Sequence, residues 1–200
     1  MKQSGIVMPG YKITDYMLIL PLPHELSEKI GVIRDNFNEK FKVPSTPSKP
    51  NLMIASFKQF AMMEERIINR LHTIAMGYPP FKVELRDFGS FPSHTIYIGV
   101  TSKIPVQGLV KKVRSDAQAL LKLDNDNKPY FALEPHLTIG RKLKPWQYEK
   151  AWLEYSTLHF TGRFIASEMV LLKRNEGDRS WQLARHFEFQ NLPVETKQGQ

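Results

Sequence analysis

The alternation of apolar and polar residues in the first part of the chain predicts two strands separated by a helix. Residues 12–20 are rich in apolar side chains and predict a strand that Pro21 and Pro23 end. From His24 to Phe41, apolar residues recur at helical spacing, which predicts an amphipathic helix. A proline-rich loop at 43–50 then leads to a second predicted strand at 51–57.

The remaining pattern alternates predicted helices with predicted strands and turns. Helices are predicted from Met63 to Ile74, from Pro105 to Leu121, and from Pro145 onward; strands at 81–86, 95–100, 134–141, 164–173 and 181–189; turns at Gly89–Pro92, 124–127 and 176–178. This mixture of helices and paired strands predicts an α+β fold.

The predicted strand at 134–141 has a polar face that carries chemically reactive side chains. Side chains alternate along a strand, so Leu137 and Ile139 point to one side, while His136 and Thr138 point to the other. Arg141 follows at the strand end. An imidazole, a hydroxyl and a guanidinium near one point suit a phosphate with a reacting oxygen, although an ordinary amphipathic strand has the same pattern.

An internal repeat links this strand to the earlier one. Aligning Pro50–Ser56 with Pro135–Arg141 makes the proline, leucine and isoleucine positions coincide. In the earlier copy Asn51 stands where the later copy has His136, and Met53 stands in place of Thr138. Such self-similarity indicates an internal duplication.

A His-x-Thr-x motif on a strand, doubled across two similar halves, resembles the 2H phosphoesterase superfamily, which includes bacterial 2'-5' RNA ligases and RNA 2',3'-cyclic phosphodiesterases. The resemblance covers roughly residues 11–190 and includes the segment from Phe88 to Val100. It implies a two-lobed fold with pseudo-duplicated antiparallel sheets, outer helices and a central cleft. It also implies catalysis by two histidines and two threonines, with no metal or other cofactor.

Only one of the two motifs is intact in this chain. The resemblance makes His136 and Thr138 the catalytic candidates, and makes Asn51 and Met53 a degenerate second motif. Three hypotheses follow: a slow phosphodiesterase or 2'-5' RNA ligase that uses His136, a non-catalytic binder of RNA ends or nucleotides, or a protein-interaction domain with a relic cleft. An asparagine can hydrogen-bond a phosphate but carries no proton near neutral pH.

Further residues are candidates for substrate contacts. Arg141 and Lys173 are candidate phosphate ligands, and Tyr16 and Phe91 are candidates to stack on a base, although aromatic residues in strands more often belong to the core. His94 precedes Thr95 and Ile96, so it does not form the His-x-Thr motif.

The amino-acid composition limits which partners and which cellular location we expect. The formal charge is +8 and the isoelectric point about 9.6, which suits acidic partners such as RNA ends or nucleotide phosphodiesters, or serves general solubility. The chain has no cysteine, which excludes disulfides and thiolate metal sites. With no long apolar stretch, we expect a cytoplasmic protein that contacts no membrane. We also expect a monomer. We expect a flexible N-terminus at 1–10, one bilobal domain at 11–190 and a loose tail at 191–200.

Overall fold

The computed structural model describes residues 11–44 and 48–193. The predicted flexible N-terminus and most of the predicted tail lie outside these residues. The elements are β1 (Ile13–Pro21), α1 (His24–Phe41), β2 (Asn51–Phe60), the short 3₁₀ helix η1 (Ala61–Met63), α2 (Glu64–Met76), β3 (Phe81–Phe91), β4 (Thr95–Val100), α3 (Lys103–Leu121), β5 (Tyr130–Phe131), β6 (His136–Arg141), α4 (Pro145–Tyr155), β7 (Thr161–Ala166), β8 (Glu168–Asn175) and β9 (Gln182–Glu188).

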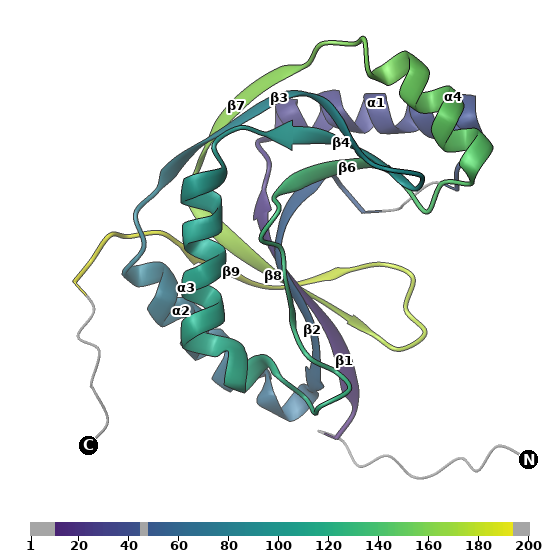
Figure 1. Ribbon diagram of the computed structural model, residues 1–200. Helices are drawn as coiled ribbons and strands as arrows, with labels where there is room; N and C mark the ends of the chain where they lie inside the picture. Colours follow the sequence, from purple (N-terminus) through teal and green to yellow (C-terminus); the bar gives the residue numbers. More distant parts are fainter. Residues whose placement is uncertain (1–10, 45–47, 194–200) are drawn as a thin grey trace, which may run out of the picture.

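These strands form two antiparallel sheets, one in each of two lobes (Figure 1). The five-stranded sheet has the order β5-β2-β1-β8-β9, and the four-stranded sheet has the order β6-β4-β3-β7. Helices α2 and α3 contact β9 and β2 of the first sheet, whereas α1 and α4 contact β6 and β4 of the second. The predicted α+β fold with two antiparallel sheets is therefore confirmed.

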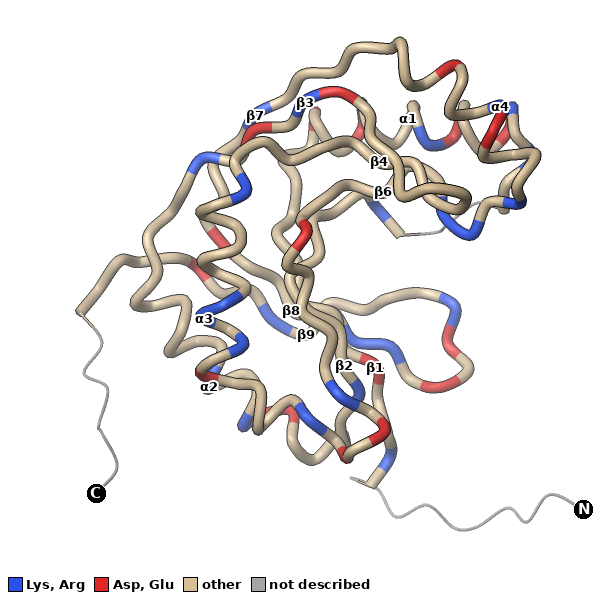
Figure 2. The backbone as a smooth tube through the Cα atoms, viewed as in Figure 1, with Lys and Arg blue, Asp and Glu red and all other residues tan. Residues whose placement is uncertain are grey.

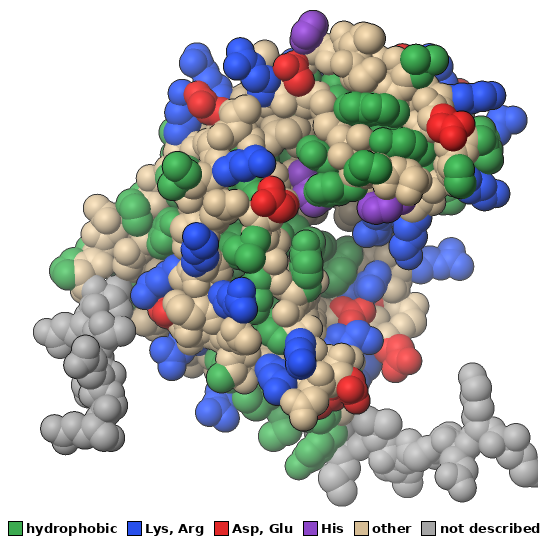
Figure 3. All heavy atoms as spheres, in the orientation of Figure 1, with side chains coloured by type: hydrophobic (Ala, Val, Ile, Leu, Met, Phe, Trp, Pro, Cys, Tyr) green, Lys and Arg blue, Asp and Glu red, His purple; other side chains and the backbone are tan. Residues whose placement is uncertain are grey.

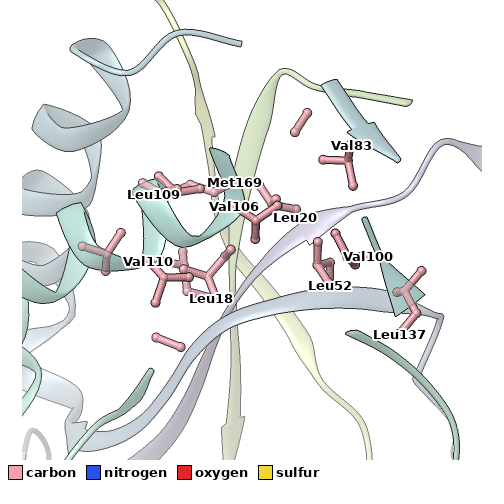
Figure 4. Packing of buried hydrophobic residues seen from close by; sticks show 14 of the residues in the cluster. Leu18, Leu20, Leu52, Val83, Val100, Val106, Leu109, Val110, Leu137 and Met169 are labelled. Atoms are coloured by element: carbon pink, nitrogen blue, oxygen red, sulfur yellow. The ribbon is translucent and has the colours of Figure 1, made fainter. Parts of the chain in front are cut away.

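The chain crosses between the sheets at two short connections. Strand β5 pairs with β2 in the five-stranded sheet, and β6 begins shortly afterwards in the four-stranded sheet. Only Ser167 separates β7 from β8, which lie in different sheets. A single buried cluster contains residues of both lobes, among them Leu18, Leu52, Val100 and Leu137 (Figure 4).

Two sequence-based expectations were wrong, and one short strand was missed. The predicted strand at 164–173 is two strands, β7 and β8. Gly89, predicted to lie in a turn, lies inside β3, where the ring of Tyr97 occupies the space that a Cβ would fill. The two-residue strand β5 was not predicted.

Helix α1 supports the strand that carries the intact motif. The ring of Phe37 lies directly against Gly140 of β6, and a Cβ on residue 140 would overlap it. Phe37 itself is fully buried. A glycine at this point therefore lets the helix approach the strand closely, which fixes β6 on one side while His136 points to the other.

Candidate functional site

The two motif strands come together where the lobes meet. Cα atoms of β2 and β6 approach within 8 Å of each other. The amide of Ala132, just before β6, donates a hydrogen bond to the carbonyl of Ile54 in β2 (2.9 Å). Figure 3 shows a hollow between the lobes with histidine and with Lys and Arg side chains at its rim.

The alternation of side chains places the four motif residues away from the core. Leu52 and Leu137 occupy equivalent positions in the repeat, and both are buried in the same cluster. Their strand neighbours therefore point to the opposite side. These neighbours are half-buried: Asn51, Met53, His136 and Thr138. That the two sets of side chains meet across the hollow stays a prediction.

His136 is held by one hydrogen bond and two aromatic rings. Its Nδ1 lies 2.7 Å from the carbonyl oxygen of Glu134. The rings of Phe91 and Tyr97 lie 4.9 and 5.1 Å from the imidazole, measured between centroids. A carbonyl oxygen only accepts hydrogen bonds, so Nδ1 carries the hydrogen. In the neutral ring, Nε2 is then the unprotonated nitrogen that can accept a proton.

Asn51 repeats the same backbone contact in the other lobe. Its Nδ2 donates to the carbonyl oxygen of Lys49 (3.0 Å), two residues back across a proline, as His136 Nδ1 donates to Glu134 across Pro135. The Asn51 amide nitrogen therefore makes the same backbone hydrogen bond as Nδ1 of His136. An asparagine side chain has no atom equivalent to Nε2, so the second lobe keeps the positioning hydrogen bond and lacks the proton-transfer nitrogen.

Two arginines lie together beside the intact motif. Arg141, at the end of β6, is exposed and pairs with Thr95 of β4. Arg34 of α1 donates from Nη1 to the carbonyl oxygen of Ser48 (3.0 Å). Burial lowers the pKa of the Arg34 guanidinium, and the nearby positive charge of Arg141 lowers it further. Figure 2 shows further Lys and Arg in the loop after β6 and in the β8–β9 hairpin.

The structure contradicts the proposed roles of Tyr16 and Lys173. Tyr16 is 1% exposed, stacks on Phe57 and donates its hydroxyl to Glu64 (3.0 Å). Lys173 pairs with Tyr16 across the sheet, and its ammonium binds the same carboxylate at 2.7 Å. Both lie on the face opposite to Asn51, which pairs with Pro21 of β1. The alternation of apolar and polar residues around Tyr16 and Lys173 predicted strands. It did not show which face of each strand packs against the helices.

The other predicted residues lie as follows. Phe91 packs on His136 and on Tyr97, with 4.7 Å between the two aromatic centroids. His94 is exposed, and its Nδ1 lies 2.7 Å from the Thr95 hydroxyl. Arg34 was missed because it belongs to an amphipathic helix with no motif around it.

Neither a metal-binding cluster nor a membrane-spanning helix is found within residues 11–44 and 48–193. In these ranges no group of three or more His, Cys, Asp or Glu side chains could hold a metal ion. No helix described there is both long and apolar enough to cross a membrane.

The protein is a two-lobed α+β protein in which each lobe contributes one motif strand, β2 or β6. Comparisons with known proteins identify its family. The model of the 2'-5' RNA ligase superfamily matches residues 41–178, a range that contains both motif strands. The chain therefore belongs to this superfamily of 2H phosphoesterases. A putative phosphoesterase of Geobacillus thermodenitrificans (strain NG80-2) is 30% identical over 97 residues, 48% of this chain and 52% of the relative. The chain thus matches about half the length of that relative.

Solved structures share the whole fold at low sequence identity. E. coli LigT complexed with 3'-AMP has a TM-score of 0.62 and 17% identity, with 89% of this chain and 98% of LigT covered. TT0787 of Thermus thermophilus has a TM-score of 0.66 and 16% identity, with 88% and 98% covered. E. coli LigT complexed with phosphate has a TM-score of 0.61 and 16% identity, with 89% and 98% covered.

Proposed function

We propose that this protein binds RNA ends or nucleotides that carry a terminal phosphate or 2',3'-cyclic phosphate, and that it hydrolyses the cyclic phosphate slowly with His136 as its one proton-transfer group. The observation that carries the proposal is the contrast between the motif residues. His136 has its Nδ1 hydrogen committed to Glu134, which leaves Nε2 as a base. Asn51 keeps the matching hydrogen bond without that base.

The proposed reaction follows from the proton-transfer groups of His136 and Asn51. Nε2 of His136 takes a proton from water while the water oxygen attacks phosphorus, and one of the two ribose oxygen bonds to phosphorus breaks. The departing ribose oxygen must take its proton from solvent, because Asn51 cannot supply one. Losing one general acid typically costs about 10²–10⁴ in rate, which is why we expect slow turnover.

Superfamily membership and the ligands that were crystallised with similar structures support the substrate class. LigT has been crystallised with 3'-AMP and with phosphate, and it shares the fold with this chain. Phe91 and Tyr97 beside His136 would offer aromatic surface to a base, and Arg34 and Arg141 would offer guanidinium groups to a phosphate. Cleavage of a linear 2'-5' linkage needs a general acid as well as a general base, and so does its reverse, ligation. Asn51 cannot supply the acid, so we propose no ligation.

The test is turnover of a nucleoside 2',3'-cyclic phosphate by the wild type and three variants. We expect slow hydrolysis by the wild type, a loss of at least about 100-fold in His136→Ala, and a gain of at least about tenfold in Asn51→His/Met53→Thr. His72→Ala is the matched control, since His72 is exposed on α2. Robust turnover that survives His136→Ala would place the chemistry elsewhere.

Binding separates the enzyme from the non-catalytic binder. A nucleoside 3'-phosphate, titrated into the wild type and into His136→Ala, measures the phosphate site without chemistry. Binding without turnover would support a binding module. If neither binding nor turnover occurs, the proposal fails and a protein-interaction domain remains as the explanation.

A further inference from the structure

A row of paired residues connects His136 to the far edge of its sheet. His136 of β6 pairs with Gly99 of β4, Gly99 pairs with Arg86 of β3, and Arg86 pairs with Thr161 of β7. Directly paired residues project from the same face of a sheet. Arg86 and Thr161 therefore lie on the same face as His136, and Arg86 is two strand spacings, or about 10 Å, from it.

Gly99 leaves the path between His136 and Arg86 open. It has no side chain, so nothing rises from β4 between the two. A Cβ at this position would lie 2.9 Å from the carbonyl oxygen of Arg86, closer than real Cβ contacts. The close approach of β3 and β4 thus requires glycine here, and it leaves bare backbone as the floor beside His136.

A groove of about 530 Å³ continues this row, and its lining includes Arg86, Thr161, Thr101, Glu84 and Arg163. Glu84 pairs with Arg163 across β3 and β7, next to the pair formed by Arg86 and Thr161. The opposite face of β7 is covered, since Gly162 lies against Leu26 of α1. The groove therefore opens on the face that carries the candidate site.

The charges of the groove favour an anion. The carboxylate of Glu84 forms an ion pair with Lys82. Across residues 11–44 and 48–193, no ion pair joins Arg86 or Arg163 to a carboxylate. Two exposed guanidiniums and the hydroxyl of Thr161 thus remain for a ligand. The Thr101 hydroxyl already donates to the carbonyl oxygen of Glu84 (3.3 Å). Arginine binds phosphates, like carboxylates, with two parallel hydrogen bonds, and a nucleic acid strand supplies phosphates.

We propose that Arg86 and Arg163 form a second phosphate subsite, which holds an internal phosphodiester of an oligonucleotide whose terminal phosphate lies at His136. This inference rests on the proposed function and extends it. It makes the substrate an RNA strand of at least two or three nucleotides and predicts that a mononucleotide uses only the His136 end of the site.

The experiment compares the dissociation constants of uridine 3'-phosphate and of a uridine trinucleotide ending in a 3'-phosphate, which avoids turnover. We expect the trinucleotide to bind about tenfold tighter, as one added charge-assisted contact provides. Arg86→Gln and, separately, Arg163→Gln should remove most of that gain and leave uridine 3'-phosphate binding unchanged. Lys150→Gln, on α4, removes one charge elsewhere and should leave both values unchanged.

The outcomes distinguish this inference from the proposed function. If uridine 3'-phosphate binds but the trinucleotide binds no tighter, or if both arginine variants keep the full gain, the second subsite is wrong and the proposed function stands. If neither ligand binds the wild type, the proposed function itself is wrong. Thermal unfolding of each variant verifies that the exposed substitutions leave the fold intact.

Discussion

At the residue scale, the two copies of the motif differ at both functional positions, and Asn51 differs from His136 by the loss of one ring nitrogen. The alignment of Pro50–Ser56 with Pro135–Arg141 predicts that Asn51 stands in for half an imidazole, and the hydrogen bonds show which half is kept. The nitrogen that fixes the side chain to the backbone is present, and the nitrogen that would meet a substrate is absent. This contact still satisfies the carbonyl of Lys49, as the His136 contact satisfies the carbonyl of Glu134.

A residue-scale prediction concerns Gly140. Gly140→Ala should lower the free energy of unfolding by about 1–3 kcal/mol, because the new methyl group overlaps the buried ring of Phe37. Gly31→Ala is the matched control: a Cβ at residue 31 of α1 meets nothing within 4 Å. It should stabilise the helix by about 0.5–1 kcal/mol. Urea unfolding measures both, and equal effects would contradict the packing argument.

At the element scale, the sequence predicted α1 correctly and failed at a strand junction. Helical spacing from His24 to Phe41 follows Pro21 and Pro23, so both the period and the start were visible. Between β7 and β8 no glycine or proline interrupts the apolar run, so the pattern alone cannot reveal that the chain changes sheets at Ser167. Which strands pair is decided by tertiary packing, which a local pattern does not contain.

An element-scale prediction concerns Asp87, which lies at the bulge of β3 in its pairing with β4. Asp87 has a φ of 51° and accepts a hydrogen bond from the Phe160 amide (3.1 Å). That bond lowers the pKa of the Asp87 carboxyl, and the His159 contact adds to the effect. A lowered pKa stabilises the fold above the unfolded-state value of about 4, and this contribution is lost as pH falls through the folded-state pKa.

Asp87→Asn isolates that charge, because asparagine tolerates a positive φ and still offers an acceptor oxygen. We expect the variant to be less stable than the wild type at pH 7. The difference should shrink as the pH falls below about 4, where the wild-type carboxyl becomes protonated. Urea unfolding at pH 7 and at a pH below about 4 measures the difference in free energy of unfolding between the variant and the wild type. A difference that stays constant with pH would show that the charge of Asp87 is not the cause.

At the scale of the whole molecule, residues distant in sequence build the candidate site. The motif alone predicted His136 and Thr138, whereas Arg34 of α1 lies near Arg141, and Arg86 of β3 lies in the row of paired residues that starts at His136. Neither arginine has a local signature, because a charged residue in an amphipathic helix or strand usually faces solvent. The net charge of +8 indicated an acidic partner but not where it binds.

The last prediction uses salt to count the charges that a bound strand neutralises. For single-stranded nucleic acid, the logarithm of the binding constant falls with the logarithm of salt concentration by about 0.7 for each phosphate neutralised. Arg34 and Arg141 lie close enough for the charge of one to lower the pKa of the other, so a phosphate between them would relieve repulsion as well as gain contacts. Each should therefore contribute to the slope measured with the uridine trinucleotide.

Arg34→Gln and Arg141→Gln should each make that slope less steep, and the double variant should reduce it by about 0.7 for the one phosphate that the two arginines share. Lys150→Gln removes the same charge from α4, where the ammonium lies over the Trp146 ring, and it should leave the slope unchanged. If all three variants change the slope equally, the attraction comes from the net charge of the whole protein. If only the two arginine variants change it, the phosphate is held beside the motif strand, where Nε2 of His136 can act on it.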